Sequence, residues 1–308
     1  MKVLVTGATG FVGTYLVDFL KKNGHQVWGI GRRSTNQVGV YLGDITDKDF
    51  VSQTIRTIKP ELVFHLAGYS LVKTSFQEPE LVRKINVEGT INLLDVLQET
   101  VPLARFLYVS SAVVYGAPSK TPITELQETR PSSPYAQSRV DTEKALLNYQ
   151  VPWMIARSFN HTGPGQTNEY VLSDWCRQAA AIELGMQPPM IRVGNVESVR
   201  DFLDVRDIVK IYYELLLKGE MYQTYNVGSG TGYRLGDLLN RILSFINVPV
   251  AVVIDNDKVR LQDTTLLVAD ISKTSNILKL YSSEYSIEQT LKDILEYWRR
   301  SLRINPTS

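Results

Sequence analysis

The sequence of 308 residues predicts an α/β fold, in which a doubly wound parallel sheet is followed by a smaller C-terminal α/β substrate domain. Three observations predict it. Short apolar segments of strand length alternate with longer segments of helical period in the first half of the chain. A glycine-rich turn joins the first strand to the first helix. After about residue 160, a loop rich in Gly, Pro and Asn introduces a different mixture of helices and short strands.

The expected strands of the first half are short and largely apolar, as in a parallel sheet that is covered on both faces. They are Lys2–Thr6, Gln26–Gly31, Leu62–Leu66, Arg105–Ser110 and Met154–Phe159. Helical periods lie between them at Phe11–Lys22, Asp47–Ile58, Pro79–Glu99 and Tyr135–Tyr149. A polar loop is expected at residues 161–168. The second half predicts helices at Val171–Leu184, Val205–Leu217, Leu235–Ile246 and Ile287–Arg299, and strands of the smaller domain at Met190–Val193, Thr224–Val227 and Val250–Ile254.

Composition excludes several classes of protein. The 33 Lys and Arg residues nearly balance the 32 Asp and Glu residues, so the net charge of +1 gives no general attraction to nucleic acid or to an anionic membrane. No apolar run approaches the roughly 18–20 residues of a membrane span, and the N-terminus lacks a signal-peptide pattern. The single cysteine, Cys176, and the three widely separated histidines argue against a disulfide framework and a metal site. We therefore expect a cytoplasmic protein.

The first turn of the chain predicts dinucleotide binding. The motif Gly7-x-x-Gly10-x-x-Gly13 directly follows the strand Lys2–Thr6 and opens a helix. Gly7 permits the tight turn, Gly10 lets the backbone approach a pyrophosphate, and Gly13 lets the helix pack closely on the strand. The alternative is a plain strand–turn–helix connection without a ligand.

The end of the second strand favours NADP(H), with NAD(H) as the alternative. NAD-binding proteins usually carry an acidic residue there for the adenosine ribose. This chain instead has Arg32 and Arg33, and no Asp or Glu occurs between Asp18 and Asp44. Two guanidinium groups suit a 2′-phosphate, although a solvated basic turn would show the same residues.

Several motifs together resemble the extended short-chain dehydrogenase/reductase family. The glycine motif, Ser111 and Tyr135 resemble features of the whole family, and Tyr135-x-x-x-Arg139 resembles its Tyr-x-x-x-Lys motif apart from the last residue. The segments Asn160-His-Thr-Gly-Pro-Gly-Gln166 and Arg200-Asp-Phe-Leu-Asp-Val-Arg-Asp207 resemble the GDP-mannose branch, which contains GDP-4-keto-6-deoxy-D-mannose reductases and GDP-mannose 4,6-dehydratases. The likeness covers nearly the whole chain.

The resemblance implies a Rossmann domain at residues 1–160 that binds NADP(H), and a mainly nucleotide-sugar-binding domain at residues 161–308. It implies a homodimer formed through the helices Pro79–Glu99 and Tyr135–Tyr149. The implied cofactor contacts are Gly7, Thr9, Gly10, Phe11, Val12, Gly13, Arg32, Arg33, Asp44, Ile45, Leu66, Ala67, Gly68, Asn86, Tyr135 and Arg139. The implied substrate contacts are Ser111, Asn160, Val171, Arg192, Arg200, Arg260 and Asp263. Without the resemblance, Arg260 and Asp263 would be interpreted as solvated loop charges.

A centre for carbonyl reduction is expected where the strand Arg105–Ser110 ends, because such sheets bind ligands at this edge. Tyr135 can protonate a carbonyl oxygen while NADPH delivers hydride to the carbon, and Ser111 can hydrogen-bond the same oxygen. Arg139, at i+4, would stabilise the phenolate by Coulomb attraction. The alternative for Tyr135 is a helix tyrosine that only packs against a loop.

Arg139 departs from the family, which has lysine at this position. Because the guanidinium is bulkier and its charge is delocalised, we expect it to lie farther from the phenol or to approach it obliquely, and we expect Arg139→Lys to raise the turnover number.

Val113 separates the possible reactions. Dehydratases of the family carry an acidic residue two places after the catalytic Ser or Thr, and Val113 cannot transfer protons. The sequence therefore favours C4-keto reduction of a nucleotide-linked 4-keto-6-deoxyhexose, with GDP-4-keto-6-deoxy-D-mannose and GDP-D-rhamnose as the substrate and product. A 4-epimerase, a 4,6-dehydratase and a weakly active NADP-binding regulatory protein remain the alternatives.

Overall fold

The computed structural model describes residues 1–33, 39–258, 265–279 and 283–304. Within these residues the large sheet has seven strands, all parallel, in the order β10-β6-β5-β4-β1-β2-β3. The strands are β1 (Lys2–Thr6), β2 (Gln26–Gly31), β3 (Val40–Leu42), β4 (Leu62–His65), β5 (Arg105–Ser111), β6 (Trp153–Ser158) and β10 (Gln223–Val227). The strand order reverses at β1, between β4 and β2. Ligands of doubly wound sheets bind at such a point, beyond the carboxyl ends of the strands.

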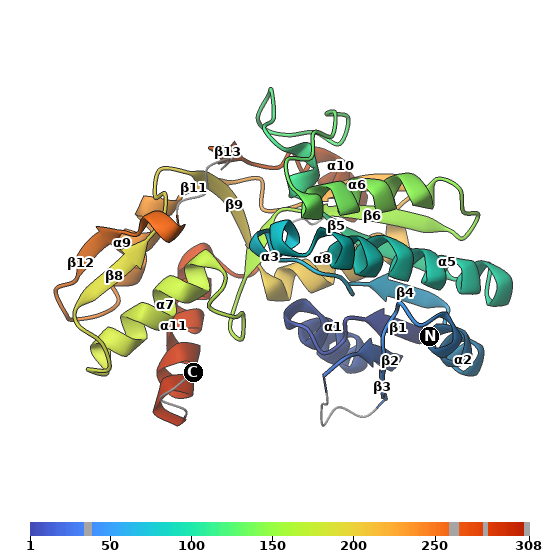
Figure 1. The fold of residues 1–308 in the computed structure, drawn as a ribbon, viewed down its shortest axis with the longest axis horizontal. Coiled ribbons are helices and arrows are strands. Elements are labelled where there is room, and N and C mark those ends of the chain that lie inside the picture. Colours follow the sequence, from blue (N-terminus) through green and yellow to red (C-terminus); the bar gives the residue numbers. More distant parts are fainter. Residues whose placement is uncertain (34–38, 259–264, 280–282, 305–308) are drawn as a thin grey trace.

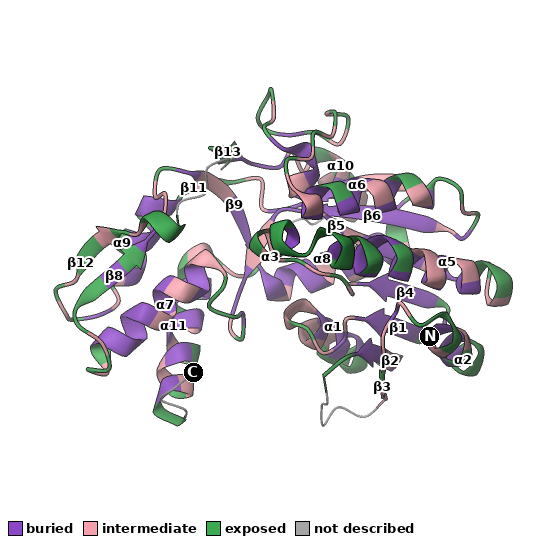
Figure 2. Ribbon diagram, viewed as in Figure 1, coloured by how far each residue is buried: buried purple, intermediate pink, exposed green. Residues whose placement is uncertain are grey.

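Helices cover both faces of this sheet, so its central strands are buried on both sides, whereas the edge strand β3 has no buried residue (Figure 1, Figure 2). Along β1, Val3 and Val5 belong to one apolar core and Leu4 to the other, as the alternation of side chains in a strand requires. One core lies under α1 (Phe11–Lys22) and α8 (Val205–Lys218). The opposite core lies under α2 (Lys48–Ile58), α5 (Gly89–Thr100) and α6 (Pro134–Leu146). The predicted doubly wound α/β fold is confirmed.

The predicted helix Pro79–Glu99 is divided in the structure. It consists of α4 (Pro79–Arg83), one π-helical turn η1 (Lys84–Glu88) and α5. In the π turn, the carbonyl of Asn86 accepts hydrogen bonds from the hydroxyls of Thr90 and Thr142, at 2.6 and 3.2 Å. Side chains therefore satisfy this carbonyl at the break, which hydrophobic periodicity cannot reveal. The predicted helix Tyr135–Tyr149 also ends earlier, at Leu146.

The second half of the chain forms a smaller lobe beside the large sheet (Figure 1). One apolar core joins its helices α7 (Val171–Glu183), α9 (Leu235–Leu243) and α11 (Ile287–Ile304). Its strands are β8 (Met190–Val193) with β12 (Ala251–Ile254), and β9 (Val199–Asp204) with β7 (Asn160–Thr162), β11 (Gly232–Arg234) and β13 (Leu266–Leu267). The remaining short helices of the molecule are α3 (Val72–Gln77) and the 3-10 turn η2 (Ala112–Tyr115) in the first half of the chain, and α10 (Ser272–Leu278) and the 3-10 turn η3 (Asn256–Lys258) in the second.

Two predictions for this half are corrected. The strand predicted at Thr224–Val227 for the smaller domain is β10, and it extends the large sheet beside β6, because Tyr225 and Val227 pack into the core under α1 and α8. The segment predicted as a loop from residue 161 begins within β7, because β9 provides a parallel partner for a polar strand. The second half of the chain thus also contributes β10 and α8 to the large sheet and its cover.

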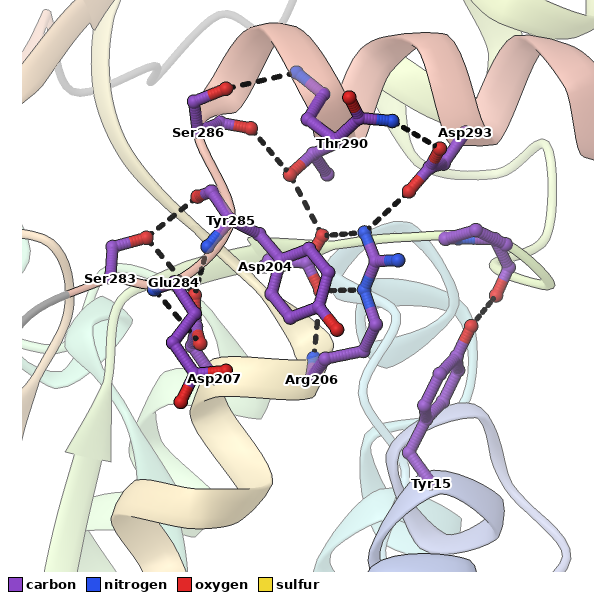
Figure 3. Close-up of polar contacts among 12 residues, drawn as sticks. Tyr15, Asp204, Arg206, Asp207, Ser283, Glu284, Tyr285, Ser286, Thr290 and Asp293 are labelled. Carbon is purple, nitrogen blue, oxygen red and sulfur yellow. Dashed lines mark hydrogen bonds and ion pairs between the residues drawn. The ribbon is translucent and has the colours of Figure 1, made fainter.

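A cluster of ion pairs fastens α11 to the start of α8 (Figure 3). Arg206 donates to both carboxylate oxygens of Asp204, at 2.8 and 2.7 Å, and lies 2.7 Å from a carboxylate oxygen of Asp293 on α11. The guanidinium carbon of Arg206 lies 3.6 Å from the centre of the Tyr285 ring. The Asp204 side chain has no exposed surface, so the cluster links α11 to the start of α8 through a buried carboxylate.

Within the described part of the chain, none of the helices has both the length and the apolar composition that a membrane span requires. The same residues contain no group of three or more His, Cys, Asp or Glu side chains placed to hold a metal ion.

Candidate active site

The turn between β1 and α1 presents the free N-terminus of a helix. Gly7 has a φ of +71°, and the N–H of Gly10 donates to its carbonyl at 2.9 Å. Gly10 offers no side-chain cap to α1, and the first turn contains no acidic residue. A Cβ on Gly13 would lie 2.1 Å from the Gly7 carbonyl oxygen, so this close packing requires glycine. Uncapped N–H groups at a helix N-terminus attract anions, and this turn therefore fits the pyrophosphate of a dinucleotide.

The other predicted cofactor residues of this turn, Thr9, Phe11 and Val12, lie next to the N-terminus of α1. Thr9 packs against Gly31 of β2, where a Cβ on the glycine would come within 2.6 Å of its side chain. Phe11 and Val12 form the first turn of α1. The ring of Phe11 stacks on that of His161 in β7, with 6.4 Å between centroids and an angle of 8°. The glycine turn therefore contacts the first strand beyond the predicted domain boundary.

Arg32 and Arg33 directly follow β2, the neighbour of β1, and both are exposed. Their charges lie one strand away from the free N-terminus of α1, where they are available to an anionic ligand. Asp44 and Ile45 follow β3. The Asp44 carboxylate accepts a hydrogen bond from the N–H of Thr46 at 2.9 Å, and Ile45 is buried. The structure thus gathers these predicted residues at the carboxyl ends of adjacent strands.

The loop after β4 contains the predicted cofactor residues Leu66, Ala67 and Gly68, of which Gly68 is exposed. Asn86 is fully buried behind this loop. Its Oδ1 accepts from the N–H of Tyr69 at 2.7 Å, and its Nδ2 donates to the Tyr69 carbonyl at 3.2 Å and to the Ser138 hydroxyl at 2.9 Å. The amide of Asn86 therefore links the loop to α6 and has internal partners for both of its ends.

The structure brings Ser111 and Tyr135 to the same edge of the sheet. Ser111 ends β5, and its Oγ accepts from the N–H of Val113 in η2 at 3.4 Å. Tyr135 lies in the first turn of α6, which Ser133 caps by accepting from the N–H of Ala136 at 3.1 Å. Because α6 packs against both β5 and η2, the first turn of this helix lies beside the end of β5.

Arg139 lies one helical turn after Tyr135 and is only 5% exposed. Its Nη1 donates to the Tyr108 hydroxyl at 3.1 Å and to the Val109 carbonyl at 3.4 Å. Its guanidinium carbon lies 5.1 Å from the centre of the Tyr135 ring and 5.7 Å from that of Tyr108. Burial opposes the charge, but the oxygens of Tyr108 and Tyr135 outweigh burial and raise the pKa of Arg139 above its ordinary value. A permanent cation therefore lies beside Tyr135.

A buried ion pair anchors α6 behind this centre. Arg157 of β6 donates through Nε and Nη2 to the carboxylate of Glu143, with a shortest distance of 2.6 Å. The Ser110 hydroxyl donates to the same carboxylate at 2.6 Å, and Nη1 of Arg157 donates to the Tyr115 hydroxyl at 3.1 Å. These contacts tie α6 to β5, β6 and η2 and fix the helix that carries Tyr135 and Arg139.

The sequence did not predict a contact that reaches the site from the smaller lobe. Tyr170 precedes α7, and its hydroxyl lies 3.0 Å from that of Ser70, in the loop after β4. Burial raises the pKa of Tyr170, whereas its hydrogen bond with Ser70 lowers it, and Tyr135 and Arg139 also act on this phenol. Tyr170 therefore lies within electrostatic range of Tyr135 and Arg139. Its only signal in the sequence was its position next to Val171, a predicted substrate residue.

The remaining predicted substrate residues lie on several elements of the smaller lobe. Asn160 opens β7, which pairs with β9, the strand that carries Arg200. Val171 opens α7, and both Asn160 and Val171 are partly exposed. Arg192 lies on β8 and is exposed. Arg260 and Asp263 lie outside the described residues.

Comparison with known proteins identifies relatives over the whole chain. A family model described as GDP-mannose 4,6 dehydratase matches residues 4–294. GDP-6-deoxy-D-mannose reductase of Pseudomonas aeruginosa is 32% identical and aligns over 98% of each chain. GDP-mannose 4,6-dehydratase of Vibrio cholerae is 28% identical over 75% of this chain and 68% of its own.

Solved structures agree with this result. RMD from Pseudomonas aeruginosa, complexed with NADPH, is similar with a TM-score of 0.87 and 29% identity, over 98% of this chain and 100% of its own. UDP-glucose 4-epimerase of Thermotoga maritima, complexed with UDP-glucose, has a TM-score of 0.85 and 28% identity, with the same coverage.

The predicted family, fold and enzyme class are confirmed by these relatives, and the NADPH in one of them agrees with the predicted cofactor. The chain belongs to the GDP-mannose 4,6 dehydratase family of nucleotide-sugar oxidoreductases, within the extended short-chain dehydrogenase/reductases.

Proposed function

We propose that this protein uses NADPH to reduce the C4 keto group of a nucleotide-linked 4-keto-6-deoxyhexose, with GDP-4-keto-6-deoxy-D-mannose as substrate and GDP-D-rhamnose as product. The observation that carries the proposal is the position of Tyr135, with the buried cation of Arg139 beside its ring and Ser111 at the adjacent strand end. The 32% identity with a GDP-6-deoxy-D-mannose reductase over nearly the whole chain supports the choice of substrate.

Each polar group then has a defined part in the reaction. Bound NADPH supplies a hydride to C4 of the sugar. Tyr135 donates its phenolic proton to O4, and the Ser111 hydroxyl holds that oxygen by a hydrogen bond. Arg139 stabilises the phenolate that remains on Tyr135. The N-terminus of α1 holds the pyrophosphate of the cofactor, and Arg32 and Arg33 bind its 2′-phosphate.

Val113 supports reduction over dehydration. It lies in η2, two residues after Ser111, where an acid–base group would be needed to move protons at the sugar ring. Its alkyl side chain cannot transfer a proton.

The smaller lobe completes the proposal. We assign residues 1–160 to NADP(H) binding and residues 161–308 mainly to nucleotide-sugar binding. The proposed nucleotide-sugar contacts are Asn160, at the boundary, and Val171, Arg192, Arg200, Arg260 and Asp263. A homodimer through α4, α5 and α6 and a cytoplasmic location remain predictions.

The test is consumption of NADPH by the purified protein in the presence of GDP-4-keto-6-deoxy-D-mannose, with the product identified by mass spectrometry and NMR. Tyr135→Phe should abolish consumption while NADPH still binds with native affinity, because the glycine turn is untouched. Native protein that binds NADPH but does not oxidise it with this sugar would contradict the proposal, as would release of a keto sugar from GDP-mannose and NADP⁺.

A 4-epimerase is the second candidate, because UDP-glucose 4-epimerase shares the fold at a TM-score of 0.85. An epimerase would interconvert two GDP-hexoses and would leave the amount of NADPH unchanged. The NADPH-consumption assay therefore separates epimerisation from reduction.

A further inference from the structure

The charge of Arg139 is buried among uncharged groups. Its Nη1 donates to the Tyr108 hydroxyl and the Val109 carbonyl, the Tyr135 phenol also interacts with the guanidinium, and its Nε is buried without a partner. The other buried arginine of this region, Arg157, is by contrast paired with Glu143. Burying a cation without a carboxylate is costly, so such a residue is retained for what its charge does at the site.

Tyr108 determines where this charge lies. Its side chain is fully buried in β5, three residues before Ser111, and its oxygen is 3.1 Å from Nη1 of Arg139. The planar guanidinium is thereby anchored to β5 at one nitrogen. Its carbon lies within 6 Å of the ring centres of both Tyr108 and Tyr135, a distance at which cations attract aromatic faces.

The loop after β4 packs against the guanidinium. A Cβ on Gly68 would lie 2.9 Å from Nη2 of Arg139 and 3.4 Å from Nη1. Gly68 is exposed, so the guanidinium lies next to backbone at the open side of the site, with Nη2 the nearer nitrogen. Nη1 is thus bound to Tyr108, and Nη2 lies closer to the place proposed for the cofactor.

We propose that Tyr108 is a positioning residue: by accepting a hydrogen bond from Nη1 of Arg139, it fixes the guanidinium beside Tyr135 with Nη2 on the side of Gly68 and of the proposed cofactor site. Tyr108 itself touches neither substrate nor cofactor and acts only through Arg139. This inference rests on the proposed function for its kinetic test, but its binding test is independent of that function.

The decisive experiment is a cycle of four proteins: native, Tyr108→Phe, Arg139→Lys and the double variant. With the GDP-linked keto sugar and NADPH, Tyr108→Phe should lower kcat about tenfold or more, which corresponds to loss of one charge-assisted hydrogen bond, while KM for the sugar changes less than about twofold. Arg139→Lys should also lower kcat. In that background, adding Tyr108→Phe should have little further effect on kcat, because the guanidinium that Tyr108 positions is absent.

Tyr225→Phe is the matched control. Tyr225 is another fully buried tyrosine of the large sheet, and its hydroxyl accepts from the N–H of Glu220 at 2.9 Å, away from Arg139. This variant should keep kcat within about twofold of native. Equal losses of kcat from Tyr108→Phe in the Arg139 and Arg139→Lys backgrounds would overturn the proposal, because Tyr108 would then act independently of Arg139.

A second readout is the dissociation constant of NADPH, measured by titration calorimetry without substrate. Tyr108→Phe should weaken binding about threefold or more in the Arg139 background and not in the Arg139→Lys background. If the native protein binds NADPH but does not turn over, the proposed function fails and this binding cycle still decides the role of Tyr108. Unchanged NADPH affinity together with native kcat in Tyr108→Phe would refute that role.

Discussion

Glu143→Gln should sharply destabilise the folded protein, although the substitution changes little but charge. Glutamine keeps the length and nearly the volume of the side chain, and its carbonyl can still accept the hydrogen bond from Ser110. What disappears is the negative partner of Arg157, which donates to Glu143 through both Nε and Nη2.

The magnitude follows from burial. The side chains of Arg157 and Glu143 are 10% and 8% exposed, so removal of one charge leaves the other in a medium of low dielectric. Breaking a buried pair in this way costs about 3–5 kcal/mol. The same change at an exposed pair costs at most about 1 kcal/mol. Because domains are usually stable by about 5–15 kcal/mol, the loss at Glu143 would be a large part of the total.

Urea unfolding, followed by circular dichroism, measures this difference. The control is Glu128→Gln, which removes the partner of Arg130 in a pair whose side chains are 73% and 65% exposed. Adding Arg157→Met to Glu143→Gln should recover part of the lost stability, because the orphaned charge is then removed as well. Equal unfolding free energies for Glu143→Gln and Glu128→Gln would refute the reasoning.

Three further predictions follow from other charged groups. Burial, with a smaller effect of Arg139, lowers the pKa of His65 from 6.5 to about 3. Between these pH values the unfolded chain binds one more proton than the folded protein, so the unfolding free energy should fall by up to about 1.4 kcal/mol per pH unit on acidification. His65→Asn should reduce this dependence of the unfolding free energy on pH, as measured by urea titrations. Neutral replacements of Arg32 and Arg33 should weaken NADP(H) about 10–100-fold in calorimetry and leave NAD(H) unchanged, and equal native affinity for the two would refute the cofactor assignment. Arg206→Met should lower the unfolding free energy by about 2–3 kcal/mol, because Asp204 stays buried, whereas Arg300→Met, at a mostly exposed pair, should change it little.

The parts of the fold that the sequence predicted are those where local pattern and tertiary structure agree. The apolar strand Lys2–Thr6, the glycine turn and the helix Phe11–Lys22 have the predicted bounds, because each is determined within a few residues. The assignment of a strand to a sheet is not local. β10 looks like the other short strands of the second half, and only its packing under α8 places it beside β6.

β7 shows the opposite case, in which a strand has no strand-like sequence. The residues Asn160–Thr162 are polar, and the following Gly and Pro residues favour a loop. Their extended conformation depends on parallel pairing with β9, which lies about forty residues later in the chain. No window of local sequence contains that partner.

In the candidate site as well, the sequence predicts what is determined locally and not the contacts between distant segments. The spacing of Tyr135 and Arg139 predicts that they share a helix face, and the end of β5 predicts where Ser111 lies. The partners of these groups come from distant segments. Tyr108 contacts Arg139 from β5, and Ser70 meets Tyr170 across 100 residues of chain. Each of these contacts depends on how two elements pack, which residue types alone do not determine.

The identity of the cation illustrates why this matters for chemistry. From the sequence, Arg139 is a bulkier replacement for lysine, and Arg139→Lys is expected to raise kcat. The contacts of Arg139 in the structure support the opposite expectation, a lower kcat. A guanidinium can bind Tyr108 and Val109 through Nη1 and still extend a second nitrogen toward Gly68, because its donors are fixed in a plane. A lysine side chain has one nitrogen: an ammonium at the position of Nη1 would bind Tyr108 but would supply no second nitrogen at the position of Nη2, which lies nearer to Gly68. Because Arg139 donates to Tyr108 and lies beside Gly68, we expect a change at any of the three to cost activity, including Arg139→Lys, although lysine is what the family resemblance implies at this position.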